Sequence, residues 1–282
     1  MIFDPAAPFA VDTNDLEYAR PEGTPLLARV YRPQGAPGTL AALVDVHGGA
    51  WSFFDRTADA YFDRALAACG LVVMALDFRQ APAHRHPAAV EDVVTGVRFL
   101  RTNASRLGVD PARIGLVGGS SGGHLLLLAA LRADADVAFA LPLWPIADPG
   151  ARYRYLLDRL ANPRPSRDPF FKAEILKQAH EAYFADLSAM DAASVPRIVA
   201  AGEAERLPPF WVAHPELDEN VTLEMTRHLV ETYRRAGGAA ELEVFEGVGH
   251  AFANFPGEAA DRCIARMKDF IGRQLEGSAR DG

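Results

Sequence analysis

Short runs of consecutive apolar residues alternate along the chain with longer segments whose apolar residues recur every three or four positions. The short runs are typical of parallel strands covered on both faces, and the longer segments of amphipathic helices. Their alternation predicts a doubly wound, mostly parallel α/β sheet. An outer antiparallel pair of strands is expected at 16–20 and 26–31. Further strands are expected at 40–47, 71–77, 114–117, 137–143, 210–213 and 242–245, and helices at 57–69, 87–108, 125–131, 221–235 and 256–275.

The alternation stops between residues 146 and 194, where no strand pattern occurs. Asp168 and Pro169 are expected to begin a helix there, as its N-cap and its first helical residue. We therefore expect one domain over residues 1–282, with a helical lid inserted at 146–194. The helical patterns of this lid lie at 153–160, at 169–180 and around Tyr183.

The segment from Arg113 to Leu131 joins a buried strand to an apolar helix through an abrupt turn, GGSSGG at 118–123. A strand, a G-x-S-x-G turn and a helix in this order are typical of a nucleophile elbow, which holds a serine hydroxyl at the top of the sheet. The turn has no lysine, which disfavours a Walker phosphate loop. Ser120 is the favoured nucleophile because the strand ends at Val117 and the elbow should follow directly. Ser121 is the alternative; with Ser120 as nucleophile, Ser121 would present its backbone N–H to the oxyanion.

A serine hydroxyl is a weak nucleophile, so it needs a base within hydrogen-bond reach and an acid that orients the base. His250 is the best candidate for the base, because it follows the last strand in a glycine-rich loop. Asp218, which follows the preceding strand, is our choice for the acid. Glu216 and Glu219 are its rivals, although Glu219 also suits the first turn of the next helix. The resulting chain order of serine, aspartate and histidine is that of α/β-hydrolases.

A fourth element, HGGAW at 47–51, ends the strand at 40–47. We expect the backbone N–H groups of Gly48 and Gly49, with that of Ser121, to hold a developing oxyanion. Glycine matters here because a side chain would block the close approach of a substrate.

Together these segments resemble the hormone-sensitive-lipase-like branch of the α/β-hydrolase esterases. The resemblance covers roughly residues 40–275 and implies an eight-stranded α/β-hydrolase sheet, a carboxylic-ester substrate and no metal or organic cofactor. It also implies that Ser120 is the nucleophile, His250 the base and Asp218 the acid, with Gly48, Gly49 and Ser121 in the oxyanion hole. The motifs that carry it are HGGAW (47–51), DFRQAPAHRHPAAVEDV (77–93), GGSSGGHL (118–125), LDENV (217–221) and GVGHAF (247–252).

Three positions depart from the pattern of that family. Ala50 replaces the third glycine of the usual HGGG, and Gly119 stands where an aspartate or similar residue often precedes the nucleophile. His214 stands where an Asp-Pro motif often supplies the acid, so the assignment of Asp218 rests on a spacing shared with related esterases and formamidases. The region before His47 is short, so the inserted segment is expected to be the main lid.

Charge and the remaining polar residues narrow the choice of partners. A net charge of −8 disfavours nucleic acids and anionic membranes. Cys69 and Cys263 are expected to be buried or half-buried thiols in a reducing compartment. No signal peptide or bilayer-spanning run is visible, which predicts a cytoplasmic protein. His124 is expected to support the elbow, whereas His180 and His228 are expected on helix surfaces.

The sequence therefore predicts a serine carboxylesterase that forms an acyl-enzyme on Ser120. A compact lid with bulky aromatic residues favours short to medium acyl chains. A formamidase or other amidase on the same scaffold is the alternative, and a ligand receptor without catalysis is disfavoured because His250 is present. The expected partner is a small ester, with no nucleic acid and no membrane, and a homodimer remains open.

Overall fold

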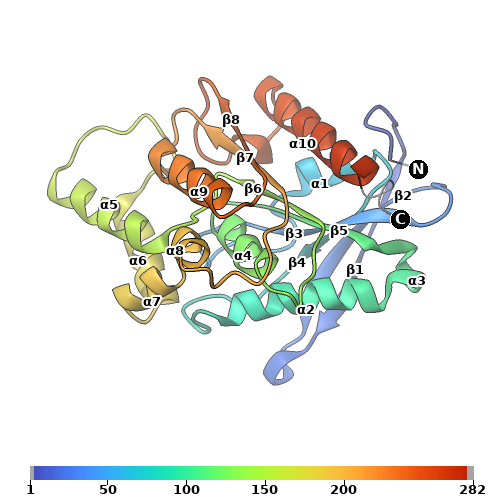
Figure 1. The fold of residues 1–282 in the computed structure, drawn as a ribbon, viewed down its shortest axis with the longest axis horizontal. Helices are drawn as coiled ribbons and strands as arrows, with labels where there is room; N and C mark the ends of the chain where they lie inside the picture. The colour runs from blue at the N-terminus through green and yellow to red at the C-terminus, as the bar shows by residue number, and fades with distance from the viewer. Residues whose placement is uncertain (1–2, 278–282) are drawn as a thin grey trace.

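Within residues 3–277, which the computed structural model describes, eight strands form one sheet in the order β1-β2-β4-β3-β5-β6-β7-β8 (Figure 1). β1 and β4 each pair with β2 in the antiparallel sense, and the other neighbours are parallel. The predicted eight-stranded, mostly parallel α/β sheet is thereby confirmed. The strands are β1 (Val11–Ala19), β2 (Leu26–Pro33), β3 (Leu40–Val46), β4 (Val72–Leu76), β5 (Val109–Gly119), β6 (Phe139–Leu143), β7 (Phe210–Pro215) and β8 (Ala240–Phe245).

Helices cover both faces of this sheet, as the continuous burial of β3, β4 and β6 requires. Val44 and Val46 point to the core under α2 and α4, whereas Leu43 points to the core under α1 and α10, because side chains alternate along a strand. Cys69 and Cys263 are buried free thiols, as predicted. The helices are α1 (Ala60–Ala67), α2 (Ala88–Thr102), α3 (Ala104–Leu107), α4 (Ser121–Ala130), α5 (Pro149–Ala161), α6 (Ala173–Tyr183), α7 (Leu187–Ala192), α8 (Val195–Ala200), α9 (Leu223–Arg235) and α10 (Glu258–Gly277), with 3-10 turns η1 (Pro21–Gly23) and η2 (Phe252–Asn254).

Four helices, α5 to α8, occupy the segment between β6 and β7 that was predicted to be helical. Figure 1 shows α5, α6 and α7 together at one edge of the molecule, with α8 between them and α4. The helical segment continues past residue 194, since α8 ends at Ala200. Tyr183 of α6 stacks on the ring of Trp51, which follows β3, with centroids 5.1 Å apart and planes 5° from parallel.

Two helix predictions need correction beyond small shifts of their ends. The long helix expected at 87–108 is interrupted at Asn103, which separates α2 from α3. The expectation that Asp168 caps a helix is wrong, because α6 begins at Ala173 and its N-cap residue is Lys172. The Asp168 side chain instead accepts a hydrogen bond from the side-chain amide of Asn220, which follows β7. None of the helices in the described part of the chain is both long and apolar enough to span a bilayer.

Candidate active site

Ser120 occupies the junction of β5 and α4 with a backbone conformation that side chains rarely adopt, φ 55° and ψ −120°. Such a conformation costs about 1–3 kcal/mol, so the surroundings must impose it. The Ser120 N–H donates to the carbonyl of Leu143 (2.9 Å), and its own carbonyl accepts from the N–H of Ile146 (3.0 Å). A Cβ on Gly122 would lie 1.8 Å from the carbonyl oxygen of Val46, so glycine is required where β3 passes the turn. β5 runs to Gly119, and Ser120 is therefore the strained residue at the apex.

The hydroxyl of Ser120 lies 2.9 Å from Nε2 of His250, and Nδ1 of the same ring lies 2.8 Å from Oδ2 of Asp218. Asp218 follows β7 and His250 follows β8, two neighbouring parallel strands whose carboxyl ends meet at one edge of the sheet. The other oxygen of Asp218 accepts the backbone N–H groups of Asn220 (2.7 Å) and Val221 (2.9 Å). These bonds orient the carboxylate of Asp218 so that its other oxygen faces Nδ1 of His250.

The rival residues are occupied elsewhere. The hydroxyl of Ser121 accepts the backbone N–H of Trp51 (3.1 Å) and is fully buried. A carboxylate oxygen of Glu216 accepts the N–H of Gly247 (2.8 Å), whereas Glu219 forms an ion pair with Arg159. The structure thus brings Ser120, Asp218 and His250 together and directs the side chains of the three alternatives away from them.

Gly48 and Gly49 lie beside Ser120. A Cβ on Gly48 would be 3.4 Å from the Cβ of Ser120, which measures how closely this backbone passes the elbow. Gly49 has φ 104°, and a Cβ there would lie 2.2 Å from the carbonyl oxygen of Phe53. Ala50, at the third position of the expected HGGG motif, also takes a positive φ of 50°. The backbone of this turn therefore has positive φ angles, which favour glycine, even at the position that alanine occupies.

A cavity of about 350 Å³ is lined by Gly48, Gly49, Ser120 and His250. Its mouth is apolar, with the rings of Phe170 and Phe255 stacked 6.5 Å apart and 1° from parallel. The polar side chains on its wall are those of Asp59, Ser120, Arg152, Asn220, His250 and Asn254. A wider hollow of about 660 Å³ beside α2 and α8 contains no residue of the Ser120 group, so we assign the chemistry to the smaller cavity.

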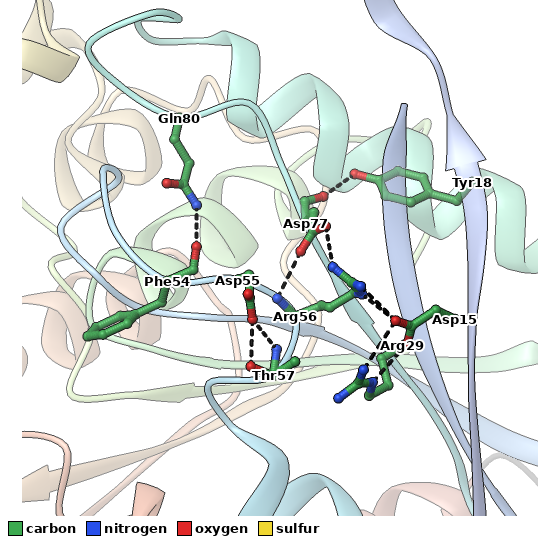
Figure 2. A network of polar contacts seen from close by, with 9 residues as sticks. All are labelled: Asp15, Tyr18, Arg29, Phe54, Asp55, Arg56, Thr57, Asp77 and Gln80. Carbon is green, nitrogen blue, oxygen red and sulfur yellow. Dashed lines mark hydrogen bonds and ion pairs between the residues drawn. The ribbon is translucent and has the colours of Figure 1, made fainter. Parts of the chain in front are cut away.

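The loop that carries Gly48 and Gly49 is anchored by charged groups at its far end. Figure 2 shows Arg56 between Asp77, which follows β4, and Asp15 of β1. Nη1 of Arg56 lies 2.8 Å from Asp77, and Nη2 lies 2.6 Å from Asp15. The pKa of Asp15 is held well below its usual range by hydrogen bonds from Arg29 and Arg56. These ion pairs connect the loop to β1 and to the end of β4, which both lie on the side of β3 away from β5.

Two supporting residues, Asp168 and Arg152, were not predicted. Oδ2 of Asp168 accepts the side-chain amide of Asn220 (2.7 Å), and Nε of Arg152 donates to the backbone carbonyl of Asn220 (2.6 Å). Both hold the loop that contains Asp218. Only helical periodicity could have indicated the role of Arg152. In α5 it shares the buried face with Leu156, whereas Arg154 lies on the exposed face.

Most of the other histidines in the described part of the chain are buried away from solvent. His124 is buried and bonds the carbonyl of Ala193 (2.9 Å), and burial lowers its pKa to about 3. Burial also lowers the pKa of His214 to about 4. The expected surface position of His228 is confirmed, but that of His180 is wrong, because Trp51 and Phe184 enclose its ring. No group of three or more His, Cys, Asp or Glu residues within 3–277 is arranged to hold a metal ion.

Comparison with known proteins shows the family of this chain. A family profile described as the alpha/beta hydrolase fold matches residues 43–254. The chain is 30% identical to an ethyl acetate hydrolase of Pseudomonas putida, over 93% of this chain and 83% of the relative. It is 29% identical to the esterase LipQ of Mycobacterium tuberculosis, over 94% of this chain and 63% of LipQ. The chain also spans only 55% and 57% of LipM and LipC from that organism.

Solved structures agree with this match. A hyperthermophilic esterase from Pyrobaculum calidifontis superposes with a TM-score of 0.78 at 25% identity, covering 96% of this chain and 86% of the other. The carboxylesterase EstE1, cloned from a metagenomic library, has a TM-score of 0.79 at 23% identity, covering 95% and 90%. At that identity the second likeness concerns the fold alone. The family resemblance drawn from the sequence motifs is confirmed.

Proposed function

Since the chain belongs to the alpha/beta hydrolase fold family, we propose that it is a serine carboxylesterase with Ser120 as nucleophile, His250 as base and Asp218 as acid. One observation carries the proposal: two hydrogen bonds, of 2.9 and 2.8 Å, link Ser120, His250 and Asp218. The linked residues are 130 and 32 positions apart in the chain. Such a relay is the arrangement that activates a serine hydroxyl at neutral pH.

In the proposed reaction, Oγ of Ser120 attacks the ester carbonyl while Nε2 of His250 takes its proton. Asp218 stabilises the imidazolium that forms, without taking the proton itself. The N–H groups of Gly48, Gly49 and Ser121 hold the tetrahedral oxyanion, where one donor is typically worth about 3–4 kcal/mol of transition-state stabilisation.

His250 then gives the proton to the departing alkoxide, and the alcohol leaves an acyl group on Ser120. Water attacks this acyl-enzyme while His250 accepts one of its protons. The second tetrahedral intermediate collapses, the carboxylic acid departs, and His250 returns the proton to Ser120.

Size and lining of the cavity support esters with short to medium acyl chains. Its volume of about 350 Å³ is near the lower end of the range of about 300–1,000 Å³ for ligand pockets. Phe53, Phe170 and Ile175 provide apolar surface for an acyl or alkyl group. The name of the Pseudomonas putida relative, ethyl acetate hydrolase, also denotes a small ester.

Labelling with a fluorophosphonate probe, followed by peptide mapping, tests the proposal. We expect one modified serine, Ser120, and no labelling of Ser120→Ala. Ser121→Ala keeps its backbone N–H and is expected still to be labelled at Ser120. Label on Ser121, or labelling of Ser120→Ala at the wild-type rate, would overturn the assignment of the nucleophile.

Relative turnover of two substrates tests the reaction class. We expect p-nitrophenyl butyrate to be hydrolysed and N-formylkynurenine to react more slowly, because the carbonyl of an activated ester is attacked more readily than that of an amide. Faster turnover of N-formylkynurenine would replace the esterase proposal with the formamidase alternative.

A further inference from the structure

One charged side chain on the wall of the cavity has no role in the proposed chemistry. Arg152, in the first turn of α5, is only 1% exposed and lines the same cavity as Ser120 and His250. Buried guanidinium groups are nearly always paired with a carboxylate. The other buried arginine of this helix follows that rule, since Arg159 forms an ion pair with Glu219.

Arg152 has no such partner. Nε donates to the backbone carbonyl of Asn220 (2.6 Å), and Nη1 lies 3.5 Å from Nδ1 of His180. The second contact is long, and Nδ1 of His180 also lies 2.9 Å from the carbonyl oxygen of Leu176, which competes with Arg152 for this ring nitrogen. Across residues 3–277 no carboxylate lies within 4.0 Å of this guanidinium, and no hydrogen bond is formed by Nη2. The charge of Asp218 acts on it only from a longer distance. Of the five donors of a guanidinium, one is thus well satisfied.

The charge of Arg152 persists at neutral pH, although burial lowers its pKa to about 10. A buried cation without a directly bonded carboxylate is costly, and a bound anion would offset that cost. A carboxylate is the natural match, because it accepts two parallel N–H bonds from the planar guanidinium.

We propose that Arg152 binds a carboxylate carried by the ester substrate, so that the natural substrates are acidic esters with the charge on the acyl or the alcohol half. The inference rests on the proposed esterase function and names its substrate class. Ser120 would attack the ester carbonyl while Arg152 holds the substrate carboxylate at the α5 side of the cavity.

The same cavity disfavours a larger anion. Arg152 is the only arginine or lysine on its wall, and the remaining lining is mostly apolar. A phosphate dianion would need further cations. Asp59 also lines the cavity, and burial raises its pKa to about 7. Its carboxyl is mostly neutral at pH 6, so an acidic ester is best measured there.

A purely structural role for Arg152 is the competing explanation, because Nε also supports the loop of Asp218 through Asn220. The two roles differ in one readout. Loss of a support lowers the turnover of charged and neutral esters alike. Loss of a binding group lowers the preference for the charged ester.

The experiment compares kcat/KM at pH 6 for two matched pairs of esters. The acyl pair is p-nitrophenyl hemiglutarate and p-nitrophenyl pentanoate, and the alcohol pair is 4-acetoxybenzoate and its methyl ester. A hydrogen bond to a charged group is worth about 1.5–3 kcal/mol, so we expect the wild type to prefer the charged member of one pair by about tenfold or more. The pair that shows the preference identifies the half of the substrate that reaches Arg152.

Variants assign the preference to this side chain. In Arg152→Met the charged-to-neutral ratio is expected to fall at least about tenfold, mainly through a higher KM, and Arg152→Lys is expected to retain part of it. Arg154→Gln is the matched control: it removes an exposed guanidinium of the same helix, paired with Asp191, and the ratio is expected to stay as in the wild type.

Several outcomes would overturn the inference. A wild-type ratio of one or less for both pairs does so without any variant, which covers the case that Arg152→Met fails to fold. An unchanged ratio in a folded Arg152→Met protein does so as well. If the wild type hydrolyses none of the four esters, the esterase proposal itself has failed; if it hydrolyses them without preferring the charged ones, only the role of Arg152 is wrong.

Discussion

Oδ2 of Asp168 lies 2.7 Å from the side-chain amide nitrogen of Asn220, and this bond joins the segment between α5 and α6 to the loop that carries Asp218. Asp168 is almost fully buried, and its second oxygen accepts the backbone N–H of Phe170 (2.9 Å). The orientation of Asp218 toward His250 thus depends on a contact from outside the sheet.

Asp168→Ala is expected to destabilise the protein by about 1–3 kcal/mol, because it leaves a buried amide of Asn220 without an acceptor. kcat/KM for p-nitrophenyl butyrate should fall about tenfold as the Asp218 loop loosens. Urea unfolding and steady-state kinetics measure both effects. A double-mutant cycle with Asn220→Ala should give a coupling energy of at least about 0.5 kcal/mol; strictly additive effects would contradict the proposed link.

Asp218→Asn is expected to lower kcat by roughly 10³- to 10⁴-fold with little change in KM, because an amide donor at that position favours the wrong tautomer of His250. Glu219→Gln is the matched control, and it should change kcat by less than about threefold because its carboxylate faces Arg159. Steady-state kinetics on a p-nitrophenyl ester measure both. The opposite ranking would assign the acid to Glu219.

Arg56→Gln is expected to lower kcat about three- to tenfold, because the loop of Gly48 and Gly49 loses its ion pairs with Asp15 and Asp77. Arg29→Gln is the control, since it removes another partner of Asp15 but none of Asp77 (Figure 2). Its kcat should remain near that of the wild type. Equal losses in the two variants would show that the sheet edge, and not the loop anchor, matters.

Stability is expected to fall as the pH rises from 5 to 9, because burial raises the pKa values of Asp45, Asp59 and Asp63, that of Asp59 to about 7. The folded state keeps these carboxyl groups protonated above pH 3.8, where the unfolded state has already released its protons, so deprotonation favours unfolding.

Asp45→Asn should reduce this loss by more than about 1.4 kcal/mol, the equivalent of one pKa unit. Urea denaturation at pH 5 and pH 9 measures it, with the exposed Asp158→Asn as control. A wild-type stability that is flat over this range, or an Asp45→Asn variant with the same slope as the wild type, would contradict the prediction.

Much of the fold and the core of the candidate site could be predicted from local patterns. Apolar runs of strand length and helical periodicity identified the strands of the sheet, and the glycines around Ser120 indicated a turn that other residues could not make. Asp218 and His250 followed from the rule that the carboxyl ends of parallel strands share one edge. These features depend on backbone conformation and on burial, which neighbouring residues encode.

Other features were decided only by tertiary structure. Nothing near Asp168 indicates that its carboxylate turns to Asn220 instead of capping a helix, and nothing near His180 indicates that Trp51 and Phe184 enclose it. In sequence Arg152 looks like Arg154, yet one lines the cavity and the other pairs at the surface with Asp191. The physical reason is that such contacts join side chains from distant segments, and only the packing of α5 and α6 against the sheet brings those segments within hydrogen-bond reach.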